Sequence, residues 1–338
     1  MDGPQRTRSR QPEGAMKYLE AIRLAQAELL AEDKRVFIYG QDIAGPFGGA
    51  FKATKGLSER FPERVLNSPI SEDAMTAIAI GAAMDGLRPI VEFQFADFAS
   101  VAFNQLVNHA GTIYYRTGLP CPIVARLPAG GTPGGGPFHC QMPEAWVSHH
   151  PGLVVVAPAT VADAYFMLKD AVACRDPVVF IEHKYLYYHL EAEFDPRTAE
   201  HPGLGRAVVR RPGEDLTIVA WSGMVHHALA AAAELDANHG ISAEVVDLRC
   251  VRPLDSETIL ASLSRTGRII IASEGWPVGG PGAEVAALVA ERGFTYLDAP
   301  PVRLAAQDTP IPFHPDLFAA HHPDDQAIVQ AALDLAKF

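Results

Sequence analysis

The sequence is poor in cysteine, in long hydrophobic runs and in positive charge. The four cysteines, Cys121, Cys140, Cys174 and Cys250, form no CxxC pair and no metal-ligand spacing, so they fit a reducing compartment better than a disulfide framework. No apolar run approaches the roughly 20 residues that a membrane helix needs. The formal net charge is −12, which argues against nucleic acid as a main partner because phosphate contacts need clustered Lys and Arg. We therefore expect a cytoplasmic protein with neither a membrane nor a nucleic-acid partner.

The opening stretch, MDGPQRTRSRQPEGA, carries arginines but has no apolar core, so it does not resemble a secretory signal. We interpret residues 1–15 as a disordered tail. A short organelle-targeting remnant is the alternative.

Apolar, β-rich runs alternate with helical patterns in two blocks. Residues 16–190 contain RVFIYG, RPIVEF, PIVARL, LVVVAP and PVVFIE, and residues 215–338 contain LTIVAW, AEVVDL and RIIIASE. Strands that are apolar on both faces and alternate with helices indicate mostly parallel sheets covered on both sides. Residues 191–214 are charged and contain Pro and Gly, and we interpret them as a linker. The expected fold is α/β with two domains.

The segment SPISEDAMTAIAIGAAMDG predicts a helix that starts near Ser71 and is apolar and small-sided all round. Such a helix is expected to be buried, and Ser71 is a suitable N-cap. Glu72 and Asp73 then have two interpretations. They are first-turn acids that favour the helix dipole, or one of them is a carboxylate in a cleft, where burial raises its pKa and lets it share a proton with a ligand.

Two further segments are candidates for a site. GGTPGGGPFHCQ follows the strand PIVARL, and loops at the carboxyl ends of parallel strands are where ligands bind in such sheets. His139 lies at its far end and can act as an acid or base near neutral pH, although an ordinary surface histidine is the alternative. In residues 92–118, polar side chains such as Asp97 and Asn104 sit among aromatics, which suggests a polar site or a subunit seam, with an ordinary core as the alternative.

Taken together, these stretches resemble the β subunit of the thiamine-diphosphate-dependent 2-oxo acid dehydrogenases, in the decarboxylating component of the pyruvate, branched-chain and acetoin complexes. The resemblance covers residues 16–338 and rests on ordered landmarks: YGQDI, GGAFKATKGL, SPISEDA, GAAMDGLRPIVEFQFADF, HCQMPEAW, HHPGLVVVAP, DPVVFIEHKYLY, DLRCVRPLD, TGRIIIASE and GAEVAALVAERGF. It implies a transketolase-like pyrimidine-binding domain (16–190) followed by a transketolase C-terminal α/β domain (215–338).

The resemblance also implies roles for individual residues. Glu72 matches the glutamate that shares a proton with N1′ of the cofactor's aminopyrimidine. Phe98 matches the aromatic that packs on the pyrimidine ring, and Ile70 its backbone and apolar neighbour. His139 matches a histidine implicated in proton transfer during decarboxylation or acyl transfer to a lipoyl group.

The same resemblance implies partners and ions. A separate α subunit supplies the diphosphate and Mg²⁺ site in an α₂β₂ assembly, and residues 215–338 dock the lipoyl acyltransferase core. The segment AVACRDPV matches a monovalent-cation loop, which implies a K⁺ site formed by carbonyls around Ile123, Ala171 and Asp176. Cys174 stands where the family often has Asp, and Cys140 replaces its common Ser, which puts the ion and the substrate in doubt.

The predicted function is therefore decarboxylation of a 2-oxo acid, pyruvate or branched-chain, with transfer of the acyl group to a lipoyl domain. One alternative is an acetoin-cleaving or acyloin-forming enzyme that uses the same cofactor. The other is a non-catalytic scaffold that keeps the fold as a partner-binding module.

Overall fold

The computed structural model describes residues 15–132, 134–199 and 201–338. The first domain is built on a seven-stranded sheet of order β12-β6-β7-β5-β4-β2-β3. All neighbours are parallel except β12, which pairs antiparallel with β6. The predicted, mostly parallel sheet is confirmed. Its strands are β2 (Val36–Gly40), β3 (Val65–Asn67), β4 (Arg88–Glu92), β5 (Val124–Ala129), β6 (Val154–Val156), β7 (Val178–His183) and β12 (Cys250–Arg252).

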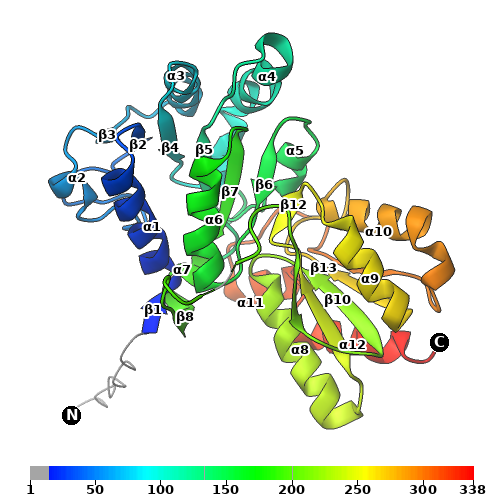
Figure 1. Ribbon diagram of the computed structural model, residues 1–338. Helices are drawn as coiled ribbons and strands as arrows, with labels where there is room; N and C mark the ends of the chain where they lie inside the picture. Colours follow the sequence, from blue (N-terminus) through cyan, green and yellow to red (C-terminus); the bar gives the residue numbers. More distant parts are fainter. Residues whose placement is uncertain (1–14, 133, 200) are drawn as a thin grey trace, which may run out of the picture.

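Helices cover both faces of this sheet, as the uninterrupted apolar strands predict (Figure 1). Alternate side chains of β7 go to opposite cores: Val178 and Phe180 to one, Val179 and Ile181 to the other. The first core is closed by α1 (Tyr18–Glu32), α6 (Val161–Ala173) and α7 (Lys184–His189). The second is closed by α3 (Glu72–Met84), η1 (Ala96–Ser100), η2 (Gln105–Ala110) and α4 (Gly111–Thr117). The short helices α2 (Leu57–Arg60) and α5 (Glu144–Ser148) complete the domain.

Residues 96–117 form three helical pieces of different kinds: the 3₁₀ turn η1, the π-helix η2 and the α-helix α4. Polar side chains in this region compete for backbone groups. Ser100 Oγ donates to the carbonyl of Asp97, and Thr112 Oγ1 donates to that of Asn108. Such local bonds offer the backbone an alternative to a regular α-helix.

The second domain has a five-stranded sheet of order β14-β13-β10-β11-β9. Helices α8 and α12 pack on one face, and α9 and α10 on the other. Its strands are β9 (Val208–Arg211), β10 (Leu216–Ala220), β11 (Ala243–Asp247), β13 (Ile269–Ala272) and β14 (Val302–Leu304). Its helices are α8 (Met224–His239), α9 (Ser256–Thr266), α10 (Pro281–Arg292), η3 (Phe294–Tyr296), α11 (Pro315–His321) and α12 (Asp325–Leu335).

The structure assigns strands to the segment interpreted as a linker, residues 191–214. Strand β8 (Glu191–Glu193) pairs with β1 (Ala15–Lys17). Ala15, which was predicted to belong to the tail, is therefore part of a strand. The rest of that predicted tail lies outside the described residues. Strand β9 pairs antiparallel with β11 and begins the second sheet. The charged residues of β9 made it look like a linker in the sequence. Arg210 donates to Asp247 Oδ2 at 2.8 Å, so this arginine joins β9 to β11 instead of facing water.

The two domains share structure across their boundary. Strand β12, which comes from the second block of sequence, forms the edge of the first sheet beside β6. One hydrophobic core runs continuously from α3 and β5 of the first domain to α9 and α10 of the second. The second domain is therefore positioned firmly against the loops that leave the first sheet.

Candidate active site

Glu72 is the first residue of α3, and only 6% of it is exposed. Its Oε1 accepts a 3.0 Å hydrogen bond from Nε2 of Gln41, and its backbone carbonyl accepts one from Thr76 Oγ1. Ser71 occupies the N-cap position, but its side chain makes no capping bond, contrary to the expectation. A buried carboxylate held by a neutral amide keeps lone pairs for another donor.

The surface of α3 differs from its prediction. The helix was expected to be buried all round, yet Ile78 is 53% exposed and Met84 is 43% exposed. The buried side is formed by Met75, Ala79, Ile80 and Ala83, which pack into the first domain. The helix is apolar on every side, but only one of its faces packs against the domain. The other apolar face is left uncovered in this chain.

His139 lies within a cluster of aromatic rings. Its ring centroid is 4.4 Å from that of Phe95, 4.5 Å from that of Phe138 and 5.7 Å from that of Phe98. Phe95 and Phe98, which begin and line η1, meet edge to face at 5.8 Å. The structure thus brings together two of the predicted site residues, Phe98 and His139, from separate loops at the carboxyl ends of β4 and β5.

The backbone around His139 is held by buried polar groups. Lys184 Nζ donates to the carbonyl of His139 and lies 5.0 Å from the centroid of Phe95, and burial lowers the pKa of this lysine. Asp97 Oδ1 accepts a 3.2 Å bond from the backbone N–H of Gln141. Burial raises the pKa of Asp97, and its Oδ2 has no hydrogen-bond partner among the described residues. Most buried polar atoms in proteins have a hydrogen-bond partner, so this oxygen is free to accept a bond from another group.

A cavity of about 540 Å³ opens beside His139. Aromatic side chains make most of its wall. Among the described residues that line it, Lys184 is the one buried cation. The lining includes Phe51, Phe95, Phe138, His139, Lys184, Tyr188 and Phe313. Glu72, Ile70 and Phe98 are not among the lining residues. The contacts of Glu72 are with Gln41 and Thr76, and those of Phe98 are with Phe95 and His139.

Ile70 is 81% exposed, just before the start of α3. Its apolar side chain therefore lies at the surface of this chain.

The residues predicted around K⁺ lie on adjoining segments. The carbonyl of Ile123 accepts a bond from Val178 N–H, and that of Ala171 accepts one from Cys174 N–H. The Arg88 guanidinium donates to the carbonyls of Val172 and Cys174 in the same loop. A positive charge therefore already lies in this loop, at the carbonyls of Val172 and Cys174.

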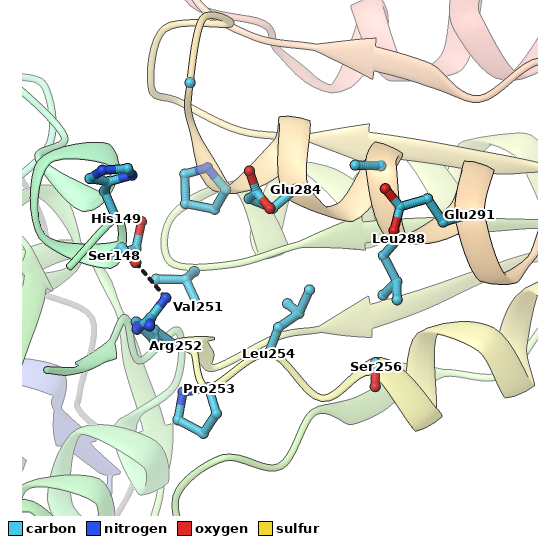
Figure 2. Close-up of a pocket in the computed structure, with 13 residues that line it drawn as sticks. Ser148, His149, Val251, Arg252, Pro253, Leu254, Ser256, Glu284, Leu288 and Glu291 are labelled. Atoms are coloured by element: carbon cyan, nitrogen blue, oxygen red, sulfur yellow. Dashed lines mark hydrogen bonds between the residues drawn. The ribbon is translucent and has the colours of Figure 1, made fainter. Parts of the chain in front are cut away.

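A larger cavity, about 650 Å³, lies between the domains and away from these groups. Figure 2 shows Glu284 and Glu291 of α10 on one side and Ser148 and His149 at the end of α5 on the other. Arg252 lies on the side of Ser148 and donates to its carbonyl at 2.9 Å. None of the predicted site residues lines this cavity.

Other chemistry is sparse in the described residues. Within ranges 15–132, 134–199 and 201–338, no group of three or more His, Cys, Asp or Glu side chains is arranged to hold a metal ion. No helix in that part of the chain is both long and apolar enough to cross a membrane. All four cysteines are free.

The two-domain architecture is that of transketolase. A model of the transketolase pyrimidine-binding domain matches residues 14–189, and one of the transketolase C-terminal domain matches residues 205–328. A solved split-gene transketolase, described as an inactive β4 tetramer, is similar with a TM-score of 0.78 and 27% identity, covering 95% of this chain and 98% of that one.

Curated relatives define the family more closely. The 2-oxoisovalerate dehydrogenase subunit beta of Bacillus subtilis is 43% identical, over 96% of this chain and 99% of that protein. The pyruvate dehydrogenase E1 component subunit beta of Rickettsia felis is 41% identical, over 92% and 95%. The chain belongs to the β-subunit family of the thiamine-diphosphate-dependent 2-oxo acid dehydrogenases.

Three residues of the site escaped the sequence analysis. Gln41 was visible only as part of YGQDI, Lys184 only as part of EHKYLY, and Glu274 only as part of IIIASE. Each acts through a contact with a distant part of the chain: Gln41 with Glu72, Lys184 with His139 and Glu274 with Gly131. The signal available was a polar residue one or two positions after a buried strand, which is where ligands bind in parallel sheets.

Proposed function

We propose that this chain works with an α subunit to decarboxylate a 2-oxo acid, pyruvate or a branched-chain one, and to pass the acyl group to a lipoyl domain. Family membership supports the reaction class. The observation that carries the proposal is the carboxylate of Glu72, buried at the start of α3 and held by the side chain of Gln41.

The residues present fit the pyrimidine of thiamine diphosphate. Glu72 offers a buried oxygen for a ring nitrogen, N1′, and holds the shared proton there. Phe98 and the exposed Ile70 offer apolar surface for the ring. When bound, the cofactor supplies an electron sink for the charge that is left as CO₂ departs. Mg²⁺ and the diphosphate belong, in this proposal, to the α subunit.

His139 is proposed to transfer protons at the substrate or at the accepting lipoyl group. Its support is its place on the wall of an aromatic cavity, with its backbone fixed by Lys184. An imidazole gains or loses a proton near neutral pH, which suits either step.

The proposed assembly is an α₂β₂ heterotetramer in the cytoplasm. The uncovered apolar residues of α3, and Ile70 beside them, support an α subunit as the partner at this face. The second domain is proposed to dock the lipoyl acyltransferase.

The test is reconstitution with the α subunit, thiamine diphosphate and Mg²⁺, followed by CO₂ release from a panel of 2-oxo acids and by acetoin cleavage. Release of CO₂ from pyruvate or a branched-chain acid supports the proposal, and cleavage of acetoin alone would favour the acyloin alternative. An assembled complex without any turnover would leave the scaffold alternative. Glu72→Gln should abolish cofactor-dependent activity and preserve assembly, whereas Asp73→Asn, the matched control on the same turn, should keep both.

K⁺ bound by the carbonyls around Ile123, Ala171 and Asp176 is a separate part of the proposal. Family resemblance supports it, and the Arg88 guanidinium in the loop opposes it. Thermal unfolding in KCl and in NaCl at equal ionic strength decides between them. A higher midpoint in KCl supports the K⁺ site, and equal midpoints leave Arg88 as the cation that holds this loop.

A further inference from the structure

The loop that carries His139 receives three contacts from the second domain. The first is polar: the backbone N–H of Gly131 donates to Glu274 Oε1 at 2.8 Å. Glu274 follows β13, and its other oxygen pairs with His183 Nε2 at 2.6 Å. Burial raises the pKa of Glu274, but the effects of His183, His322 and the Gly131 N–H together outweigh it and lower that pKa to about 2. An ionised carboxylate therefore holds the start of the loop.

The second contact is steric. Gly131 lies against the ring of Phe318, on α11, so closely that a Cβ at Gly131 would be 2.1 Å from Phe318 Cζ. The φ of Gly131 is not in the left-handed region, so the backbone conformation does not require glycine here. Glycine is needed because the ring of Phe318 occupies the space that a side chain would fill.

The third contact is at the middle of the loop. A Cβ at Gly136 would be 2.3 Å from Cε1 of Phe313, and the N–H of Gly134 donates to the carbonyl of Phe313 at 3.2 Å. Phe313 also lines the cavity beside His139. In Figure 1, α11 lies at the centre of the molecule, where the two domains meet.

We propose that Glu274, Phe313 and Phe318 are positioning residues, through which the second domain fixes the loop that presents His139 to the reacting groups. The inference rests on the proposed catalytic role of His139. It gives the second domain a part in the active site in addition to the proposed docking of the acyltransferase. Gly131 makes room for the ring of Phe318, and Gly136, whose φ of +70° also favours glycine, makes room for the ring of Phe313. The carboxylate of Glu274 anchors the loop at Gly131.

Steric complementation tests the contact at Gly131. In the α₂β₂ complex, Gly131→Ala should displace the loop and lower kcat by about tenfold or more, because a small misplacement of a catalytic group is costly. The KM for the 2-oxo acid and cofactor affinity should stay within about twofold, since Glu72 and Phe98, proposed to bind the pyrimidine, belong to α3 and η1 and not to the loop itself. Adding Phe318→Ala removes the ring that the new methyl group meets, so kcat of the double variant should rise from that of Gly131→Ala to about that of Phe318→Ala alone. A double variant no better than Gly131→Ala would overturn the steric part of the proposal.

Hydrogen exchange provides a readout that needs no turnover. Phe318→Ala and Glu274→Gln should each speed amide exchange in residues 130–141, while Phe294→Ala, which alters an exposed ring elsewhere in the second domain, should not. Phe318 is only half-buried, so its truncation should leave the fold intact, and Phe318→Leu should give an intermediate effect.

The two readouts separate the inference from the function on which it rests. A wild-type complex without turnover would sink the proposed function, and the exchange data would still show whether the second domain holds the loop. Faster exchange together with a lower kcat at unchanged KM supports the positioning role. Unchanged exchange in both variants overturns it, and so does unchanged kcat in a complex whose loop exchanges faster.

Discussion

Nε2 of Gln41 donates a 3.0 Å hydrogen bond to Oε1 of Glu72, and these two buried side chains come from different strand ends of the same sheet. Gln41 follows β2, and Glu72 follows β3 and begins α3. The oxygen of the same amide, Gln41 Oε1, has no hydrogen-bond partner among the described residues. Gln41 therefore orients the carboxylate and adds no charge beside it.

Replacing Gln41 should weaken cofactor use without disturbing assembly. Gln41→Leu removes the amide donor, and a net hydrogen bond of about 1–1.5 kcal/mol corresponds to a roughly tenfold loss in kcat/KM. Gln41→Glu should cost more, because it sets a second carboxylate against Glu72. Titration of activity with thiamine diphosphate measures both effects. An unchanged activation curve for Gln41→Glu would show that Gln41 does not act on Glu72.

The exposed side of α3 should be the surface where the chain meets its α subunit. Ile78→Lys places a charge on that face, and a charge buried without a partner in an interface is costly, so association should weaken by at least about tenfold. The side chain is already half exposed, so the free chain should remain folded. Sedimentation with the co-expressed α subunit measures association. Val209→Lys, at an exposed apolar position on the edge strand β9, is the control and should assemble normally.

The elements that could be predicted are those that local sequence dictates. RPIVEF and PVVFIE are apolar on both faces, and each became a buried central strand, β4 and β7. Strand β9 could not be predicted, because Arg210 in it is neutralised by Asp247 from β11, which the sequence places far away. The burial of α3 was overestimated for a similar reason. Its composition is apolar on every side, and composition alone cannot distinguish the face that packs into the domain from the face that this chain leaves exposed.

The same limit applies to the site. Glu72, Phe98 and His139 could be named because they stand in motifs that resemble a known family. Gln41, Lys184 and Glu274 could not, because charged and amide side chains usually face water. Their burial follows only from the long-range packing that brings α3, α7 and the end of β13 to the loops of the first sheet.

Arg126 should be the least replaceable charged residue of the first domain. Its fully buried guanidinium binds Glu182 at 2.6 Å and Glu92 at 2.5 Å, which links three neighbouring strands, β4, β5 and β7. Arg126→Met would leave two buried carboxylates without a counter-charge and should lower the free energy of unfolding by about 3–5 kcal/mol.

A compensating variant separates charge from packing at Arg126. Glu92→Leu and Glu182→Gln, added to Arg126→Met, remove both stranded charges, and Gln keeps an oxygen for the hydroxyl of Tyr187 that donates to Glu182. This triple variant should regain most of the lost stability in urea unfolding. A triple variant as unstable as Arg126→Met would mean that the shape of the guanidinium matters more than its charge.

Glu144 should make stability fall as pH rises towards neutrality. It lies buried on α5, and its Oε1 accepts a 2.8 Å bond from Trp221 Nε1 of the second domain. Burial raises the pKa of Glu144 from 4.5 to about 7, although the bond from Trp221 opposes the shift. Because the folded-state pKa lies above the unfolded one, this group's stabilisation is complete below about pH 4.5 and is lost as pH rises through about 7.

The neutral variant Glu144→Gln should remove that dependence, because Gln keeps an oxygen for Trp221 and has no proton to lose. The gap of about 2.5 pKa units corresponds to on the order of 3 kcal/mol, so the variant should gain stability relative to the wild type between pH 5 and 8. Urea midpoints measured across this range for both proteins give the difference directly. Since all other titrating groups are common to the pair, parallel curves would mean that Glu144 keeps the same protonation state in the folded and unfolded chains.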